Sequence, residues 1–144
     1  MKSQTLSDIW EKDSKINKEN LEESLFEIPS IHAKYIHLLL VEKREIALAK
    51  AKLNKLNIEK FEFYTDGEYQ GAPEEWVRPP KGGVNKNQAQ PYIDADTQIQ
   101  EETLKISAIS DRIDFLNEVI RQINSRNFII KNIIELRKLG GETW

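Results

Sequence analysis

The sequence contains no cysteine, only two histidines and one methionine. The absence of cysteine excludes a disulfide framework, a thiolate metal site and a cysteine nucleophile, and it fits a reducing, intracellular setting. No apolar run approaches the roughly 20 residues that a membrane-spanning helix needs, and the first residues contain no hydrophobic signal region. We therefore expect a soluble protein without a membrane segment.

Glycine and proline are also missing from a long stretch, because neither occurs between Ile31 and Tyr64. Such a stretch favours one long helix, about 50 Å in length at 1.5 Å per residue. The chain has 144 residues, of which 39% are hydrophobic and 31% charged. We expect a single all-α domain with a lean core.

A regular apolar seam predicts that this helix packs against a second one. Isoleucine and leucine recur at steps of three and four along the chain, which is typical of helices packed lengthwise; the positions are Ile106, Ile109, Ile113, Leu116, Ile120 and Ile123. We expect an antiparallel hairpin of residues 30–64 against residues 92–123. Short helices should precede it within residues 1–29, with Pro29 ending the last of them.

Residues 124–139 predict a separate C-terminal helix that begins at Ser125 and stops at Gly140. Its apolar residues cover more than half of the helix circumference, which is more than one small subunit can bury. We therefore expect a contact between subunits of a homo-oligomer, for which a ring is a plausible form. The predicted contact residues are Phe128, Ile129, Ile130, Ile133, Ile134, Leu136 and Leu139.

The segment 65–91 reads as an irregular loop, because it holds four of the six glycines and four of the five prolines. Its aromatic and apolar residues are expected to pin it onto the helices; they are Tyr69, Trp76, Val77 and, just beyond, Tyr92. Asp94 or Asp96 should then cap the next helix.

Residues with catalytic chemistry do not form a recognisable constellation. His32 and His37 are five positions apart on the predicted helix and point about 140° away from each other, so they cannot share a metal ion. Asp94 and Asp96 could hold Mg²⁺ as a nuclease pair, but helix capping explains them. A phosphate-binding loop of the GxxxxGK[ST] type is absent. We expect neither an enzyme nor a bound cofactor.

The net charge of −3 hides acidic and basic segments. Residues 1–30 hold four lysines against seven acidic residues, and residues 92–123 hold three basic against seven acidic residues. Between Lys43 and Lys60 the order reverses, since six basic residues face only Glu45 and Glu59. A polyanionic partner is therefore compatible with the negative net charge of the chain. Salt screens distant charges, so the electrostatic field that a ligand meets depends on the charges nearby.

The basic segment ends in aromatic residues, and that combination is used by proteins that bind single-stranded nucleic acid without sequence preference. The candidate DNA-binding residues are Lys43, Arg44, Lys50, Lys52, Lys55, Lys60 and Tyr64. The alternative is a solvated helix face with Phe61 and Tyr64 in the core.

The order of several landmarks resembles the UvsY family, the recombination mediators of T4-like phages. The landmarks are Trp10 with Asp13, Tyr35, Lys60-Phe61-Glu62-Phe63-Tyr64-Thr65, Tyr92-Ile93-Asp94-Ala95-Asp96 and Ser125-Arg126-Asn127-Phe128-Ile129-Ile130-Lys131. The resemblance covers nearly the whole chain. Lys60 matches the second position of the family's DNA-contacting basic pair, whereas the first falls on Ile58, so that Lys55 or Lys52 would have to substitute for it.

This resemblance implies a helical protein that is not an enzyme and that forms a ring, a hexamer or a heptamer. It implies three kinds of partner: single-stranded DNA, a RecA-type phage recombinase and the phage single-strand-binding protein. The implied function is to load the recombinase onto DNA covered by that protein, in the cytoplasm of the infected bacterial host. The alternative function is a structural or scaffold homo-oligomer without nucleic-acid binding.

Overall fold

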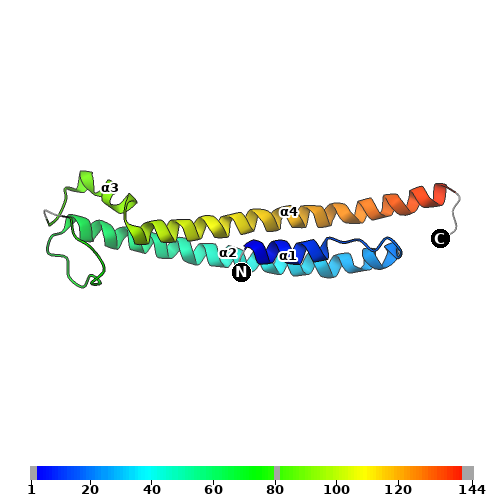
Figure 1. Ribbon diagram of the computed structural model, residues 1–144, viewed down its shortest axis with the longest axis horizontal. Helices are drawn as coiled ribbons and strands as arrows, with labels where there is room; N and C mark the ends of the chain where they lie inside the picture. Colours follow the sequence, from blue (N-terminus) through cyan, green and yellow to red (C-terminus); the bar gives the residue numbers. More distant parts are fainter. Residues whose placement is uncertain (1–2, 80–81, 141–144) are drawn as a thin grey trace. The chain divides into compact units, whose positions relative to one another are not determined.

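The computed structural model describes residues 3–79 and 82–140, and their elements are helices joined by loops (Figure 1). The elements are α1 (Ser3–Asp13), α2 (Leu21–Thr65), the short 3-10 helix η1 (Lys86–Gln88), α3 (Ala89–Asp94) and α4 (Thr97–Leu139). The predicted all-α class is confirmed, because these residues contain no strand. Among the same residues, no helix is long and apolar enough to cross a membrane.

The chain folds as two compact units, and α2 and α4 each contribute to both. Unit 1 comprises the described residues up to Arg44 and from Ile109 onward, and unit 2 comprises Glu45–Ala108. The two helices are antiparallel in each unit. In unit 1, Glu42 of α2 pairs with Arg112 of α4; in unit 2, Lys52 of α2 pairs with Glu102 of α4.

The core of unit 1 is formed where α1, α2 and α4 meet. Its buried residues are Leu6, Tyr35, Leu39, Leu116, Val119 and Ile123. All six positions of the predicted seam are buried or half-buried, so the seam between two long helices is confirmed. The ring of Trp10 meets that of Tyr35 edge-on, with 5.4 Å between their centroids, and this contact holds α1 against α2.

Polar contacts fix the connection between α1 and α2. The Tyr35 hydroxyl donates to the Asp13 carboxylate over 2.9 Å. Burial of the Tyr35 hydroxyl and its bond to Asp13 raise the Tyr35 pKa well above its usual range. From α4, the Arg126 guanidinium donates to the main-chain carbonyls of Asp13 and Lys15. Residues 13–15 are therefore held from two helices.

Unit 2 has a core of its own, in which the end of α2 is covered by the irregular segment and α3. The buried residues are Phe63, Tyr64, Ala89, Ile93 and Ile99. Tyr69 and Trp76 pack against them as predicted, and the Tyr92 ring lies 5.8 Å from that of Tyr64, but Val77 is 77% exposed. Arg78 is an anchor that the sequence did not reveal, because it donates to the carbonyls of Phe63, Asp66 and Tyr69.

One glycine is required by a close approach in this unit. The chain passes the end of α2 at Gly83, where an added Cβ would lie 2.8 Å from the Thr65 carbonyl oxygen. Directly after it, the Val84 amide donates to the Tyr64 carbonyl over 2.8 Å. The irregular segment is thus joined to the helix end by main-chain contacts.

The predicted helix end at Pro29 is wrong, because α2 begins at Leu21 and continues through Pro29. Asn20 caps this start, since its side chain accepts from the Glu23 amide. A proline inside a helix costs about 3 kcal/mol. Ile28 and Ile31, on either side of it, pack against the unit 1 core, and this burial outweighs the local penalty.

The predicted helix start at Ser125 is also wrong, since α4 runs without a break from Thr97 to Leu139. The Ser125 hydroxyl donates to the Arg121 carbonyl one turn earlier, which is what a serine does inside a helix. Ile123, Arg126 and Ile130 continue the buried face across the proposed junction. The expected second and third helices are therefore one.

Truncation of the seam tests this core. We expect Leu116→Ala to lower the free energy of unfolding by about 3 kcal/mol, because a fully buried leucine leaves a cavity. Chemical denaturation followed by circular dichroism measures the loss. The matched control is Leu104→Ala in the same helix, where the side chain is 69% exposed and the change should stay within about 0.5 kcal/mol. Equal losses for both variants would contradict the assignment of the seam.

Candidate nucleic-acid interface

One side of α2 in unit 2 presents a cation, two amides and an aromatic ring. Lys50, Asn54, Asn57 and Phe61 follow one another at steps of four, three and four, so they lie along the same side of the helix. Asn57 is half-buried and the other three are exposed, Phe61 to 37%. An exposed aromatic ring and a cation along the same side of a helix form a surface on which a base can stack while a phosphate is neutralised.

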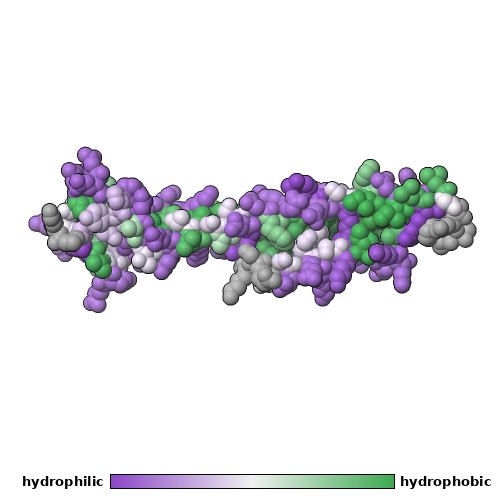
Figure 2. Space-filling view, turned by 45° about the horizontal axis from the view of Figure 1, so that its top comes forward, coloured by the Kyte–Doolittle hydropathy of each residue, from purple (hydrophilic) through white to green (hydrophobic). Residues whose placement is uncertain are grey.

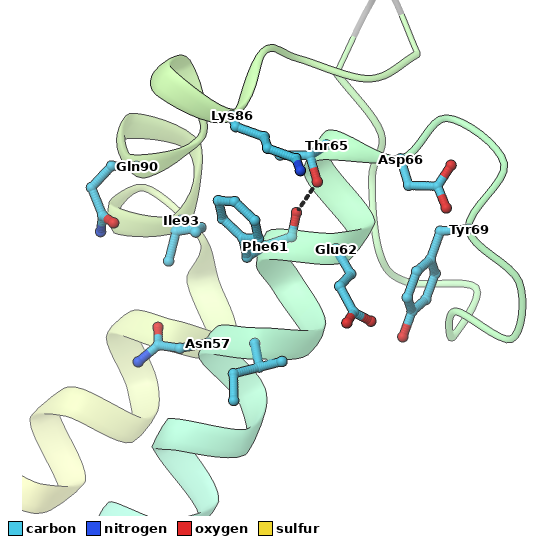
Figure 3. Close-up of a pocket in the computed structure, with 10 residues that line it drawn as sticks. Asn57, Phe61, Glu62, Thr65, Asp66, Tyr69, Lys86, Gln90 and Ile93 are labelled. Carbon is cyan, nitrogen blue, oxygen red and sulfur yellow. Dashed lines mark hydrogen bonds between the residues drawn. The ribbon is translucent and has the colours of Figure 1, made fainter.

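This side of α2, which we call the α2 flank, leads into an open hollow of about 800 Å³. The hollow is lined by Asn57, Ile58, Phe61, Glu62, Thr65, Asp66, Tyr69, Lys86, Gln90 and Ile93. Figure 3 shows Phe61 projecting from α2 toward Ile93 of α3, with the Lys86 side chain above it. Lys86 comes from η1, which the Asn85 side chain caps by accepting from the Asn87 amide.

The charges around the hollow are segregated. In Figure 3, Asn57, Gln90 and Ile93 lie on one side of α2, and Glu62, Asp66 and Tyr69 lie on the other. Among residues 3–79 and 82–140, Lys50 and Lys86 have no ion-pair partner. Their charges are therefore available to phosphates, that of Lys86 at the hollow and that of Lys50 farther along the α2 flank.

The other exposed basic residues of the predicted DNA-binding set are divided between the two units. Lys43 and Arg44 are exposed on α2 in unit 1. In unit 2, Lys52 pairs with Glu102 over 2.9 Å and Lys55 lies 3.9 Å from Glu59, both at exposed lysines. Such surface pairs are worth little, about 0 to 1 kcal/mol, so they do not prevent either lysine from turning to another anion.

Lys60 and Tyr64, which the sequence placed on the DNA-binding face, lie inside unit 2. Lys60 is 2% exposed; its ammonium is 2.9 Å from the Asp96 carboxylate and 3.7 Å from the centroid of the Trp76 ring. The Tyr64 hydroxyl donates to the same Asp96 oxygen over 2.6 Å. In this arrangement both polar groups are engaged by Asp96 inside the unit. Both side chains lie on the face of α2 that is turned toward α4 within unit 2. This is why they are buried, whereas Lys50 is exposed.

Asp96 joins these two side chains to the start of α4, as the predicted helix cap. One carboxylate oxygen accepts from the amides of Gln98 and Ile99, and the other accepts from Lys60 and Tyr64. Burial alone would raise the pKa of Asp96, but the hydrogen bonds from Tyr64, Lys60 and the Ile99 amide hold it below its usual range. Burial and the bond to Asp96 raise the pKa of Tyr64.

The predicted alternative of a metal-dependent nuclease gains no support from the geometry. Asp96 is occupied by Lys60 and Tyr64, and Asp94 accepts from the Gln90 amide over 2.7 Å. Across the described part of the chain, no three His, Cys, Asp or Glu residues gather in a way that could hold a metal ion.

The predicted subunit contact residues in unit 1 divide into three sets. Phe128, Ile129, Leu136 and Leu139 are exposed, Phe128 to 68% and Leu136 to 69%. Figure 2 shows apolar side chains gathered at the C-terminal end of α4, where these residues lie. Ile133 and Ile134 are half-buried. Ile130 is fully buried and belongs to the subunit's own packing, because it continues the seam beyond Ile123.

Sequence reasoning missed part of the interface. Asn57, Lys86 and Gln90 join Phe61 around the hollow only because the irregular segment and α3 fold back beside the end of α2. The step pattern from Lys50 to Phe61 was present in the sequence and could have identified the α2 flank. Lys86 carried no such signal, since it stands in η1, far along the chain from Phe61.

The chain was compared with protein families, with curated proteins and with solved structures. The family model described as "Recombination, repair and ssDNA binding protein UvsY" matches residues 9–141. None of the curated proteins compared with the chain matches it.

Solved structures of the bacteriophage T4 recombination mediator protein UvsY share the fold. The chain from lattice type II is 18% identical, with a TM-score of 0.81 and 99% of each chain covered. The chain from lattice type IV is 17% identical, with a TM-score of 0.80, 97% of this chain and 99% of that chain covered. The chain from lattice type I is 18% identical, with a TM-score of 0.80, 94% and 98% covered.

A double-mutant cycle tests the buried ion pair. We expect Asp96→Asn to lower the free energy of unfolding by about 3 kcal/mol, because asparagine still caps α4 but leaves the Lys60 charge buried without a counterion. Lys60→Met combined with Asp96→Asn should recover at least about 1 kcal/mol of that loss, since no buried charge remains. Lys60→Met alone completes the cycle, and chemical denaturation measures all three variants. A loss in the double variant equal to the sum of the two single losses would contradict a coupled pair.

The pH dependence provides a second readout of the same pair. Because the folded pKa of Asp96 is lowered, the unfolded chain takes up the proton first as the pH falls. The stabilisation is therefore present above about pH 5 and is lost as the pH falls through the folded pKa. The double variant should lose less stability over that range than the wild type does.

Proposed function

This chain belongs to the UvsY family of recombination, repair and ssDNA-binding proteins, and from that membership we propose that it is a recombination mediator. The family is one of DNA-binding proteins and is not known for an enzymatic activity. The proposed function is to bind single-stranded DNA and to promote loading of a RecA-type recombinase onto DNA covered by single-strand-binding protein in the infected bacterial host. We expect no catalytic step and no cofactor.

The observation that carries the proposal is the α2 flank of unit 2. Lys50 and Lys86 lack ion-pair partners within the described residues, and the ring of Phe61 is exposed between them at the hollow. A strand running along this side meets a cation, then the amides of Asn54 and Asn57, then an aromatic face. Phosphate contacts of this kind supply affinity without sequence preference, and stacking adds roughly 1 to 3 kcal/mol per base.

The proposed binding is shared among the subunits of a homo-oligomeric ring. The exposed apolar residues at the C-terminal end of α4, Phe128, Ile129, Leu136 and Leu139, support assembly, because so large an apolar surface is rarely left uncovered on a monomer. Each subunit then holds the strand weakly, and the effective concentration of linked sites gives the ring its affinity. Weak individual contacts allow the strand to be passed on to the recombinase piece by piece.

A structural homo-oligomer without DNA affinity is the second candidate, and the same apolar residues favour it. The two candidates differ in one measurement, the binding of a labelled single strand at several salt concentrations. Tight, salt-dependent binding of the single strand and weaker binding of duplex support the mediator. No binding at low salt would leave only the structural function.

Removal of Lys50 and Lys86 tests the DNA interface. We expect Lys50→Ala with Lys86→Ala to weaken binding of a single-stranded oligonucleotide and to flatten the slope of log affinity against log salt by roughly 0.7 for each lysine lost. Fluorescence anisotropy at three or more salt concentrations measures both effects. The control with the same change of charge is Lys12→Ala with Lys18→Ala, two exposed lysines of unit 1. An equal effect of both pairs would show that only net charge matters.

Charge placed on the exposed apolar residues tests assembly. We expect Phe128→Asp with Leu136→Asp to reduce the mass measured by light scattering and, through lost avidity, to weaken DNA binding. Their side chains are 68% and 69% exposed, so the monomer should remain helical by circular dichroism. Leu104→Asp in unit 2 is the control, because its side chain is equally exposed, at 69%. A double variant of unchanged mass would place the subunit interface elsewhere.

A further inference from the structure

A second cavity, of about 340 Å³, lies within unit 2 on the side of α2 that carries Lys60. It is formed by the end of α2, the irregular segment at residues 75–77 and the start of α4. The lining residues are Lys60, Tyr64, Glu75, Trp76, Val77, Ala95, Asp96, Thr97 and Gln98. Its volume is near the lower end of the roughly 300 to 1,000 Å³ typical of small-ligand sites.

Two buried polar atoms beside this cavity have no hydrogen-bond partner in the described part of the chain. They are the indole Nε1 of Trp76, which can only donate, and the amide Oε1 of Gln98, which can only accept. A buried donor or acceptor without a partner costs free energy. A ligand that hydrogen-bonds to both atoms therefore gains binding free energy from each of them. The cavity therefore calls for a ligand with an acceptor and a donor of its own.

The charges exclude a phosphate as that ligand. The lining residues carry one cation, Lys60, and two carboxylates, Glu75 and Asp96. The Lys60 ammonium is already taken by Asp96 and lies against the face of the Trp76 ring. Apart from Glu75, the rest of the lining offers a ligand apolar wall from Val77 and Ala95, the Thr97 side chain and the two unpartnered atoms. The ligand should therefore be uncharged and small, with polar groups along one edge.

We propose that this cavity binds a nucleobase of the single strand, with Trp76 Nε1 donating to a base acceptor and Gln98 Oε1 accepting from a base N–H group. Every nucleobase carries both kinds of group on its edges, and unstacked single-stranded bases present them. The base meets the edge of the indole, because Lys60 covers one face of the ring. This assignment rests on the proposed single-strand binding and adds base recognition to it.

Both atoms are covered in the free protein, so the base reaches them through a small movement. Trp76 stands in the irregular segment, outside any helix, and we expect its ring to turn so that Nε1 meets an entering base. Gln98 needs only a rotation about its last side-chain bond, because that bond has a broad torsional preference. The Asp96 cap and the Lys60 pair stay in place during this change.

Two oligonucleotides of equal length separate base binding from phosphate binding. One carries normal bases and the other carries abasic sites, so that the phosphate charges are identical. We expect Trp76→Phe to weaken binding of the normal strand about fivefold and to leave binding of the abasic strand unchanged, because phenylalanine keeps an aromatic ring and loses the N–H group. Gln98→Met should do the same. Trp10→Phe, the matched change in unit 1, should alter neither affinity.

Fluorescence of the cavity tryptophan gives a direct readout. In a Trp10→Phe/Trp144→Phe variant, Trp76 is the one remaining tryptophan. Binding of the normal strand should change the emission of Trp76, and binding of the abasic strand should not. Circular dichroism shows whether each variant retains its helices. If Trp76→Phe does not retain them, Gln98→Met serves as the test.

The possible results are distinguishable. If Trp76→Phe and Gln98→Met weaken both strands equally, or neither strand, the cavity holds at most water and the inference is overturned, while strand binding by the lysines stands. If the wild-type protein binds neither strand, the proposed function fails and the inference fails with it. Selective loss on the normal strand together with a strand-specific emission change supports the nucleobase site.

Discussion

The ion pair between Lys60 and Asp96 is the interaction on which the arrangement of unit 2 depends. One carboxylate caps the first turn of α4, accepts the Tyr64 hydroxyl and neutralises an ammonium that lies over the Trp76 ring. It thereby joins the end of α2, the start of α4 and the irregular segment at one point. A buried pair is not a large net source of stability, because desolvation offsets most of the attraction. Its effect is geometric, since either charge left alone would be costly and the three segments must therefore meet here.

This pair also determines which cations remain for a ligand. Lys60 belongs to the basic stretch by sequence, but its charge is balanced inside the unit. Lys86, brought in from η1, keeps its charge at the surface of the hollow beside Phe61, and Lys50 keeps its charge about three turns earlier on the α2 flank. The candidate interface is therefore assembled from two separate segments of the chain, and its polar and aromatic groups lie where a strand could contact phosphate and base together.

The architecture could be predicted from the sequence because the apolar repeat from Ile106 to Ile123 has a helical period and needs a partner of similar length. Two local signals gave wrong predictions: Pro29 predicts a helix end and Ser125 predicts a helix start. In both cases the packing of nearby apolar residues, Ile28, Ile31 and Ile130, outweighed the local preference. The site was harder to predict. Lysines at positions 50 and 60 look alike in sequence, and only the direction of the helix face relative to α4 decides that one is exposed and the other buried.

The hydrogen bonds from Arg126 to the main chain at residues 13 and 15 affect which substitutions this protein can accept over evolutionary time. Both acceptors are main-chain carbonyls, so the bond depends on the path of the chain and not on the identity of the side chain at Lys15. Substitutions at that position can accumulate without loss of the contact, as long as the arginine is retained. Among related chains, we therefore expect variation at position 15 and retention of the arginine at position 126.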